Sequence, residues 1–291
     1  MTTPLDDRRP IEAGAARHDL LKRVVSGLVL GGLALGSAML GGRTFALFWL
    51  VACTVMAWEW QRMVDMPGAF RRTLAGGAAL AAATPYAIGW FPDAALAIVL
   101  AGVALTAAIA PRGRRLWCAV GIASAGALLV AVCLLRSSIS AGLASIIWVF
   151  AVVWGTDVFA YFGGRFFRGP KLWPRISPSK TWSGFVVGVV AGASAGAAFG
   201  LWQGPMNTAI VPLGILGLCA ASLSQAGDLF ESAVKRHFGV KDSSRLIPGH
   251  GGVMDRLDGF LAAAVFAALV GAGRGSDFAH TATGLFAWWT P

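Results

Sequence analysis

An all-α polytopic membrane protein with about nine transmembrane helices and a cytoplasmic N-terminus is the fold that this sequence predicts. Hydrophobic residues make up 56% of the 291 residues and charged residues only 13%, whereas soluble domains carry about 25% charged residues. Apolar runs long enough to cross a bilayer recur from residue 20 onward. Lysine and arginine gather between alternate runs. These observations indicate one membrane-embedded chain.

The apolar runs define nine candidate spans. They cover residues 20–40, 44–64, 73–91, 94–110, 116–135, 142–163, 181–202, 209–230 and 258–273. A last, short run ends in Trp288 and Trp289, and we interpret it as an interfacial tail because Trp is enriched at headgroup level. The predicted regions are a cytoplasmic N-terminal segment (1–19), a scaffold of spans (20–141), a catalytic region (142–273) with cytoplasmic loops 164–180 and 231–257, and a C-terminal tail (274–291).

Positive charge fixes the predicted orientation of these spans. With a cytoplasmic N-terminus, 21 of the 24 lysines and arginines lie on the cytoplasmic side, and only Arg43, Arg136 and Arg274 lie on the other. Topology and anionic lipids therefore account for the net charge of +10, and no nucleic-acid partner is expected. The four cysteines lie inside apolar runs without a Cys-x-x-Cys motif, which predicts neither disulfides nor a zinc site.

The seventh span carries a glycine at every fourth position. The stripe consists of Gly184, Gly188, Gly192, Gly196 and Gly200. It leaves one helix face without side chains, so that another backbone can approach closely. The stripe predicts either packing between helices of this chain or a homodimer seam.

The end of the eighth span carries the first candidate site residues. On a helix, Asp228, Ser232 and Lys235 fall on one face, at positions i, i+4 and i+7. An acid at the edge of an apolar run is costly and usually has a partner or a function. The alternative is an interfacial aspartate that faces solvent or pairs with Lys235.

A glycine-rich turn around His250 precedes the ninth span. Its backbone can approach a phosphate closely and offer N–H donors. Asp255 and Asp258 follow at the start of the span, where the helix dipole favours carboxylates. Taken singly, Asp255 could equally be a helix cap and His250 a turn residue.

Five cations and several hydroxyls lie between residues 163 and 182, just before the seventh span, and this arrangement favours anion binding. The alternative is a positive-inside loop with a helix cap at Ser179. Together the three segments offer carboxylates without His or Cys clusters, which suit hard cations such as Mg²⁺. They also offer Lys, Arg and glycine-rich backbone for phosphates. A metal-bound triphosphate and an anionic lipid would require such a collection.

Residues 232–258 resemble the signature of the phosphatidate cytidylyltransferases, also called CDP-diacylglycerol synthases. The pattern is Ser-x-x-Lys-Arg, four residues, Lys-Asp, then Pro-x-His-Gly-Gly and Asp-Arg-x-Asp, and it has no mismatch here. Residues 177–182, 227–231 and 157–164 are also similar to that family. One departure is Val158 and Phe159, where family members often have a small residue and Gly.

The resemblance implies that CTP and phosphatidate are converted into CDP-diacylglycerol and pyrophosphate. It also implies a Mg²⁺-dependent homodimer, with room for a second cation, in a bacterial-type cytoplasmic (inner) membrane, with its active site on the cytoplasmic face. The implied catalytic residues are Asp228, Asp255, Lys241 and His250, the two aspartates being the metal ligands. The implied substrate-binding residues are Ser177, Lys180, Lys235, Arg236, Asp157, Ser232 and Arg256.

Three alternatives differ in the sequence features they need. A transporter would place acids such as Asp157, Asp228 and Asp255 near the midplane and often shows internal repeats, whereas these acids lie at one interface without a repeat. A CDP-alcohol phosphotransferase needs an arginine and two further acids after Asp258-Gly259, and the ninth span lacks them. A related CTP-dependent enzyme acting on another lipid phosphate stays open.

Overall fold

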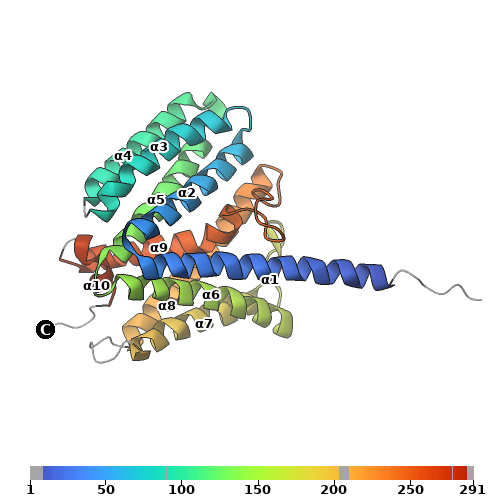
Figure 1. The fold of residues 1–291 in the computed structure, drawn as a ribbon. Helices are drawn as coiled ribbons and strands as arrows, with labels where there is room; N and C mark the ends of the chain where they lie inside the picture. Colours follow the sequence, from blue (N-terminus) through green and yellow to red (C-terminus); the bar gives the residue numbers. More distant parts are fainter. Residues whose placement is uncertain (1–8, 90, 203–209, 277, 287–291) are drawn as a thin grey trace, which may run out of the picture.

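Nine long helices make up most of the described part of the chain, and each overlaps one of the predicted spans. The computed structural model describes residues 9–89, 91–202, 210–276 and 278–286 (Figure 1). The long helices are α1 (Arg9–Leu40), α2 (Gly42–Val64), α3 (Ala69–Ile88), α4 (Pro92–Ile109), α5 (Arg115–Ser137), α6 (Gly142–Phe167), α7 (Trp182–Trp202), α8 (Ile210–His237) and α9 (Met254–Arg274). The short helices are η1 (Arg112–Arg114), η2 (Phe278–His280) and α10 (Thr281–Phe286).

Seven of the described helices are long and apolar enough to cross a membrane, and they are α1 and α4 to α9. The predicted all-α polytopic membrane protein is thereby confirmed. The two others, α2 and α3, carry buried polar side chains, among them Glu59, Gln61 and Arg72, which lower their hydropathy. The number nine and the cytoplasmic N-terminus stay predictions.

The helices form two groups with α9 between them (Figure 1). Helices α2 to α5 pack on one another, and α6, α7 and α8 form the second group, while α9 contacts α5 and α8. Helix α1 packs along α2 and α6 but is mostly exposed. Only 11% of the apolar stretch within its residues Lys22–Leu40 is buried. The second group and α9 supply most of the chemistry described below.

The glycine stripe of α7 serves packing inside the chain. A Cβ atom at Gly188 would lie 2.7 Å from the Thr156 carbonyl oxygen of α6, and one at Gly196 would lie 2.7 Å from the Leu213 carbonyl oxygen of α8. Helix α7 therefore approaches the backbones of both neighbours, which only a residue without a side chain permits. Of the two interpretations of the stripe, internal packing is the one observed.

Several helices continue past the apolar runs that predicted them. Helix α6 ends at Phe167 and α8 at His237, while α9 begins at Met254. Backbone hydrogen bonding does not stop where the side chains become polar. Parts of the predicted cytoplasmic segments 164–180 and 231–257 are therefore helical, and their place outside the membrane stays a prediction.

The first of these loops also contains an antiparallel hairpin, which the all-α prediction missed. Its strands are β1 (Lys171–Trp173) and β2 (Ser177–Thr181). Thr181, and not Ser179, caps α7, since the Gly184 N–H donates to Thr181 Oγ1 at 3.1 Å. The hairpin therefore delivers Lys180 directly to the start of α7.

The predicted C-terminal tail is partly packed. Helix α10 lies against α9 and α5, and its Thr281 and Leu285 are buried. The tryptophans of the expected interfacial tail, Trp288 and Trp289, lie outside the described residues.

Candidate active site

A polar cavity of about 660 Å³ opens where α6, α7, α8 and α9 meet the hairpin and the loop between α8 and α9. It gathers most of the predicted site residues from segments far apart in the sequence. Its polar lining includes Asp157, Lys180, Gln225, Asp228, Lys235, Asp242, His250, Asp255, Arg256 and Asp258. Carboxylates and cations therefore alternate around one space.

Asp228 on α8 is paired with Lys180 from the end of β2. The Lys180 Nζ atom lies 2.6 Å from Asp228 Oδ2 and donates to Gln225 Oε1 at 3.1 Å. Ser232, one helical turn later, donates to Asp228 Oδ1 at 3.4 Å. The expected face of α8 thus exists, but the cation that Asp228 contacts is Lys180 and not Lys235.

Gln225 joins this pair to Asp157, and sequence reasoning missed it. Its Nε2 donates to Asp157 Oδ1 at 3.5 Å across the α6–α8 contact. The available signal was a glutamine in an apolar run, three residues before Asp228 and hence on the same helix face. Val158 and Phe159, which depart from the family pattern, are half-exposed and leave α6 unbroken.

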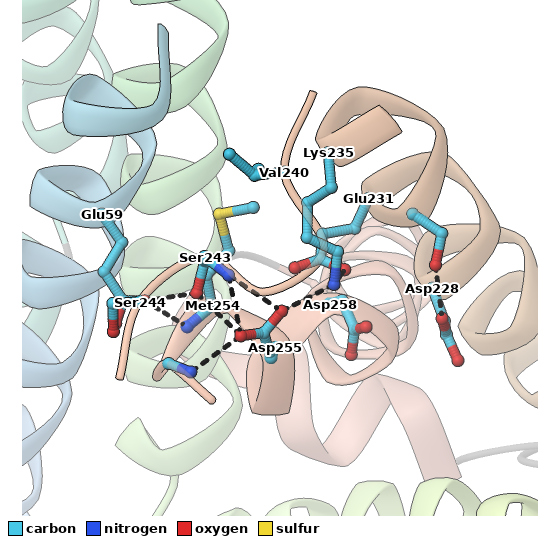
Figure 2. A network of polar contacts seen from close by, with 12 residues as sticks. Glu59, Asp228, Glu231, Lys235, Val240, Ser243, Ser244, Met254, Asp255 and Asp258 are labelled. Carbon is cyan, nitrogen blue, oxygen red and sulfur yellow. Dashed lines mark hydrogen bonds and ion pairs between the residues drawn. The ribbon is translucent and has the colours of Figure 1, made fainter. Parts of the chain in front are cut away.

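Asp255, in the first turn of α9, connects α8 to the loop before α9 (Figure 2). Its Oδ1 accepts a hydrogen bond from Lys235 at 2.6 Å, and Lys235 also lies 2.6 Å from Glu231 Oε2. Its Oδ2 accepts from the Gly252 N–H at 2.7 Å, the Ser243 N–H at 3.0 Å and the Ser243 hydroxyl at 2.9 Å. Asp255 therefore holds the glycine-rich turn in place.

The glycine-rich turn is tight and contacts α1. Gly249 and Gly251 have φ angles of 77° and 79°, which favour glycine, and the Ile247 N–H donates to the Gly251 carbonyl at 2.8 Å. His250 Nδ1 lies 2.7 Å from the hydroxyl of Ser26 in α1. Burial, and then the positive charges of Arg256 and Arg23, lower the pKa of His250, which favours the neutral imidazole.

A second cavity of about 670 Å³ adjoins the first and is strongly basic. The two share Asp242, His250 and Arg256. Lys241 lines this second cavity, together with Arg245 of the loop and Arg23 of α1. A polyanion that extends from the first cavity would meet these cations.

Three predicted residues line neither of these two cavities: Ser177, Ser232 and Arg236. Arg236 instead ties the hairpin to the end of α8, because Nε donates to the Ile176 carbonyl at 3.4 Å and Nη1 to the Val240 carbonyl at 3.1 Å. Ser232 reaches the site only through Asp228. Ser232 and Arg236 therefore support the site from outside.

Glu59 of α2 is a further residue that sequence reasoning missed. It is fully buried and accepts hydrogen bonds from the loop before α9 and from the first backbone N–H groups of α9 (Figure 2). The available signal was an acidic side chain inside an otherwise apolar predicted span. Through Glu59, the group of helices α2 to α5 thereby contacts the loop and the helix that carry site residues.

The donor set has the chemistry for a hard cation. Asp157, Asp228, Asp255 and Asp258 line one cavity, and carboxylate oxygens are the ligands that Mg²⁺ prefers. Within the described ranges, no three His, Cys, Asp or Glu side chains form a metal-binding group by themselves. One or two carboxylates with phosphate oxygens and water would suffice for Mg²⁺. The residues therefore fit a cation that is shared with the substrate.

Comparisons with known proteins agree with this chemistry. The sequence model described as "Cytidylyltransferase family" matches residues 21–272. The phosphatidate cytidylyltransferase of Brucella abortus is 38% identical over 262 residues, which cover 87% of this chain and 94% of that protein. The protein of the same name from Pseudomonas aeruginosa is 37% identical over 271 residues, covering 86% and 97%. The one from Bacillus subtilis is 39% identical over 147 residues, covering 49% and 54%.

Proposed function

This chain belongs to the cytidylyltransferase family, and on that premise we propose that it joins CTP to phosphatidate, forming CDP-diacylglycerol and pyrophosphate. The observation that carries the proposal is the cavity where Lys180, Lys235 and the aspartates meet at one end of apolar helices. A lipid can keep its acyl chains in the bilayer while its phosphate reaches these groups.

In the reaction, a phosphate oxygen of phosphatidate attacks the α-phosphorus of CTP. The bond from that phosphorus to the bridging oxygen breaks, and pyrophosphate leaves with the electron pair. A phosphate monoester has a second pKa of about 6 and is largely ionised at neutral pH. The nucleophile therefore needs no strong general base from the protein.

The cations of the chain orient the phosphates and offset their charge. We assign the reacting phosphates to the first cavity, where Lys180 and Lys235 are the nearest ammonium groups to Asp228 and Asp255. We assign the pyrophosphate end of CTP to the adjoining basic cavity, with Lys241 and the glycine turn around His250. Fixed positive charge is worth most where negative charge develops on the leaving group.

We also propose Mg²⁺ as the cofactor, held by Asp228 and Asp255, with Asp258 beside them for a second cation. Bound Mg²⁺ would neutralise charge on the phosphate oxygens. Asp228 and Asp255 each have a lysine ammonium at 2.6 Å. These lysines offset the charge of the two carboxylates, and they are within reach of phosphate oxygens that a cation would bring.

The proposed setting is a homodimer in a bacterial cytoplasmic membrane, with the cavity on the cytoplasmic face. Support for the dimer comes from the family resemblance alone, and support for the face comes from the charge asymmetry of the segments between spans. The mass of the protein in lipid nanodiscs would test the dimer, since one and two copies of a 30.2 kDa chain are readily distinguished.

A reconstitution assay tests the activity. Purified protein with CTP, phosphatidate and Mg²⁺ is expected to release pyrophosphate and CDP-diacylglycerol in equal amounts. Omission of either substrate or chelation of the metal should stop both products. Turnover with another lipid phosphate but not with phosphatidate would replace this substrate assignment and retain the nucleotidyl transfer.

A further inference from the structure

Glu59 is an acidic residue of the N-terminal group of helices, α2 to α5. It lies against the loop between α8 and α9 (residues 238–253), called the catalytic loop below. Glu59 belongs to α2, more than 180 positions before its partners in the sequence, and its exposed fraction is 0%. Figure 2 shows its carboxylate beside Ser243, Ser244 and Met254, on the far side of Asp255 from α8. A fully buried carboxylate at this place needs an explanation, because burial without partners is costly.

Four donors surround the Glu59 carboxylate, and all are uncharged. The Met254 N–H donates to Oε2 at 2.7 Å, and the Val253 N–H donates to Oε1 at 3.0 Å. The Ser244 hydroxyl donates to Oε1 at 2.5 Å, and the Ser243 hydroxyl lies 3.2 Å from Oε2. Both oxygens are therefore used by the segment that leads into α9.

The two backbone donors belong to the start of α9. The first N–H groups of a helix have no partner within the helix and carry its positive dipole end. The residue at the N-cap position is Val253, and its side chain cannot accept a hydrogen bond from these N–H groups. Glu59 supplies the missing acceptor and the favourable negative charge from a different helix.

The same contact reaches Asp255 through one serine. The Ser243 hydroxyl lies between the Glu59 and Asp255 carboxylates, at 3.2 Å and 2.9 Å, and its single proton can serve only one of them at a time. Gly252 has no room for a side chain, because a Cβ atom would collide with Ser243 and Glu59. The loop is thus hydrogen-bonded on one side to the Glu59 carboxylate of α2 and on the other to the Asp255 carboxylate of α9.

We propose that Glu59 is a positioning residue, which fixes the catalytic loop and the first turn of α9 so that Asp255 and the glycine turn meet the nucleotide. This inference rests on the proposed function. It assigns Glu59 to the CTP side of the site, since the four hydrogen bonds to the Glu59 carboxylate among the described residues come from that loop and from α9. We assign the phosphatidate phosphate to the part of the first cavity that Asp157, Lys180 and Gln225 line. These residues lie on other segments and are hydrogen-bonded to one another, so we expect phosphatidate binding not to depend on Glu59.

The test is the substitution Glu59→Gln, with Glu59→Ala as the more severe change. Glutamine keeps the shape but replaces one acceptor oxygen by a donor, so that two of the four hydrogen bonds are lost and donors face each other. We expect kcat/KM for CTP to fall roughly tenfold to a hundredfold, while KM for phosphatidate stays unchanged. Adding Ser244→Ala to Glu59→Gln should reduce kcat/KM little further, because the two residues share one interaction.

Gln61→Leu is the matched control. Gln61 is equally buried on α2, but its hydrogen-bond partners are Arg72 of α3 and the Cys118 carbonyl of α5 and not the loop before α9. This variant should lose thermal stability without a selective effect on CTP. If Glu59→Gln raised both Michaelis constants alike and behaved as Gln61→Leu does, Glu59 would be a structural residue only and the inference would be wrong.

Hydrogen exchange provides a readout that needs no turnover. In the Glu59→Gln protein, the backbone amides of Gly252, Val253 and Met254 should exchange faster, while those of α7 should not change. If Glu59→Gln accelerates exchange at these amides relative to the wild type, but the wild type turns over no lipid phosphate, the proposed function would be refuted and the positioning role would stand. Unchanged exchange in the Glu59→Gln protein would overturn the positioning role, whatever the activity.

Discussion

Each carboxylate proposed to bind the metal is paired with a lysine. Lys180 lies against Asp228, and Lys235 lies against Asp255, both at 2.6 Å. An opposite charge at this distance offsets the negative charge of the carboxylate when no cation is bound. The lysines are themselves donors suited to phosphate. The same side chains can therefore hold the site together before the substrate binds and then contact the substrate.

The two aspartates are expected to act as a unit. Asp228→Asn and Asp255→Asn keep the side-chain shape but remove the charge, so each should abolish nearly all turnover, and the double variant should be barely worse than either single one. Asp242→Asn should cost less, because Asp242 is exposed. The measurement is the rate of pyrophosphate release together with Mn²⁺ binding followed by electron spin resonance.

Asp93→Asn is the control for this pair, since Asp93 is exposed at the start of α4, far in sequence from the cavity. Wild-type turnover in either of the first two variants at ordinary Mg²⁺ concentration would contradict the shared-cation assignment. For Asp255 the role that would then be left is the clamp on Ser243 and Gly252.

Lys180 and Lys241, both assigned to phosphate binding, line different cavities, and we expect both to be needed for activity. A charge-assisted contact is worth about 1.5–3 kcal/mol, so Lys180→Ala and Lys241→Ala should each lower activity about tenfold to a hundredfold without loss of membrane insertion. Lys180 lines the first cavity and Lys241 the second. Arg112→Ala removes a cation from η1 and serves as the control. Unchanged kinetics in both lysine variants would mean that these lysines only orient the chain in the membrane and do not bind phosphate.

His250 predicts a pH dependence of stability. Its pKa is lowered by burial and then by Arg256 and Arg23, whereas an imidazole in the unfolded chain titrates near about 6.5. The unfolded state therefore binds the proton more readily. The contribution of His250 to stability is full above about pH 6.5 and is lost as the pH falls toward its folded pKa.

Thermal unfolding in detergent between pH 7.5 and pH 5 measures this effect. The unfolding temperature of the wild type should fall more steeply with acid than that of His250→Gln, because titrating carboxylates are common to both proteins. The same substitution at the exposed His280 should leave the slope at the wild-type value. If the unfolding temperatures of the wild type and His250→Gln fell equally with acid, protonation of His250 would not contribute to the pH dependence of stability.

The residues that sequence reasoning could name are those with a recognisable local pattern. Asp228 and Asp255 stand in a long signature, and Lys180 stands in a short one. Gln225 and Glu59 were missed because each acts on a partner that is distant in sequence, Asp157 in one case and Ser243 in the other. No periodicity connects such pairs, since only the packing of the helices brings them together.

At the level of elements, close backbone packing builds the catalytic group. Because α7 approaches both α6 and α8 through its glycines, Asp157 on α6 and Asp228 on α8 reach one cavity. The apolar runs were sufficient to predict these helices, because length and hydropathy decide what crosses a bilayer. Their polar ends and the hairpin were not predictable, since helix continuation and strand pairing there depend on local contacts.

A side chain on the glycine stripe should separate these helices. At Gly192 a Cβ atom would lie 2.7 Å from the Ala221 Cβ of α8, so Gly192→Val should destabilise the protein by about 1–3 kcal/mol and lower activity. Unfolding in detergent with a chemical denaturant measures the loss. Gly36→Val on α1 meets no heavy atom within 4 Å and should be tolerated. Equal stability of the two variants would show that α7 does not need its glycines.

For the whole molecule, the contacts of α1 and α2 bear on the number of spans. Ser26 of α1 and Glu59 of α2 both contact the segment between α8 and α9. The chain leaves this level at Ser26, turns at Gly41 and returns to it at Glu59. About 15 residues of helix lie on the first leg and about 18 on the second, or roughly 22 Å and 27 Å at 1.5 Å per residue, which approaches the thickness of the hydrocarbon core.

We therefore expect α2 to cross the membrane and return to the side of the catalytic loop. Nine spans and seven spans place the catalytic loop and the C-terminus alike, and they differ only in the short connection between α2 and α3. Arg62, Arg71 and Arg72 flank that connection, and positive charge favours the cytoplasm. The connection between α2 and α3 is thus the position at which a topology experiment discriminates.

Labelling of single introduced cysteines in intact cells with a membrane-impermeant maleimide decides between the two topologies. Ile139→Cys, between α5 and α6, should react from outside, because Ile139 is 98% exposed and lies on the predicted external side. Val240→Cys and Pro67→Cys should react only after the membrane is permeabilised. The wild type gives the background, since three of its four cysteines are buried. Reaction of Pro67→Cys in intact cells would mean that α2 does not cross, and the Glu59 contact would then require the catalytic loop to lie within reach of the outer side, against the charge asymmetry.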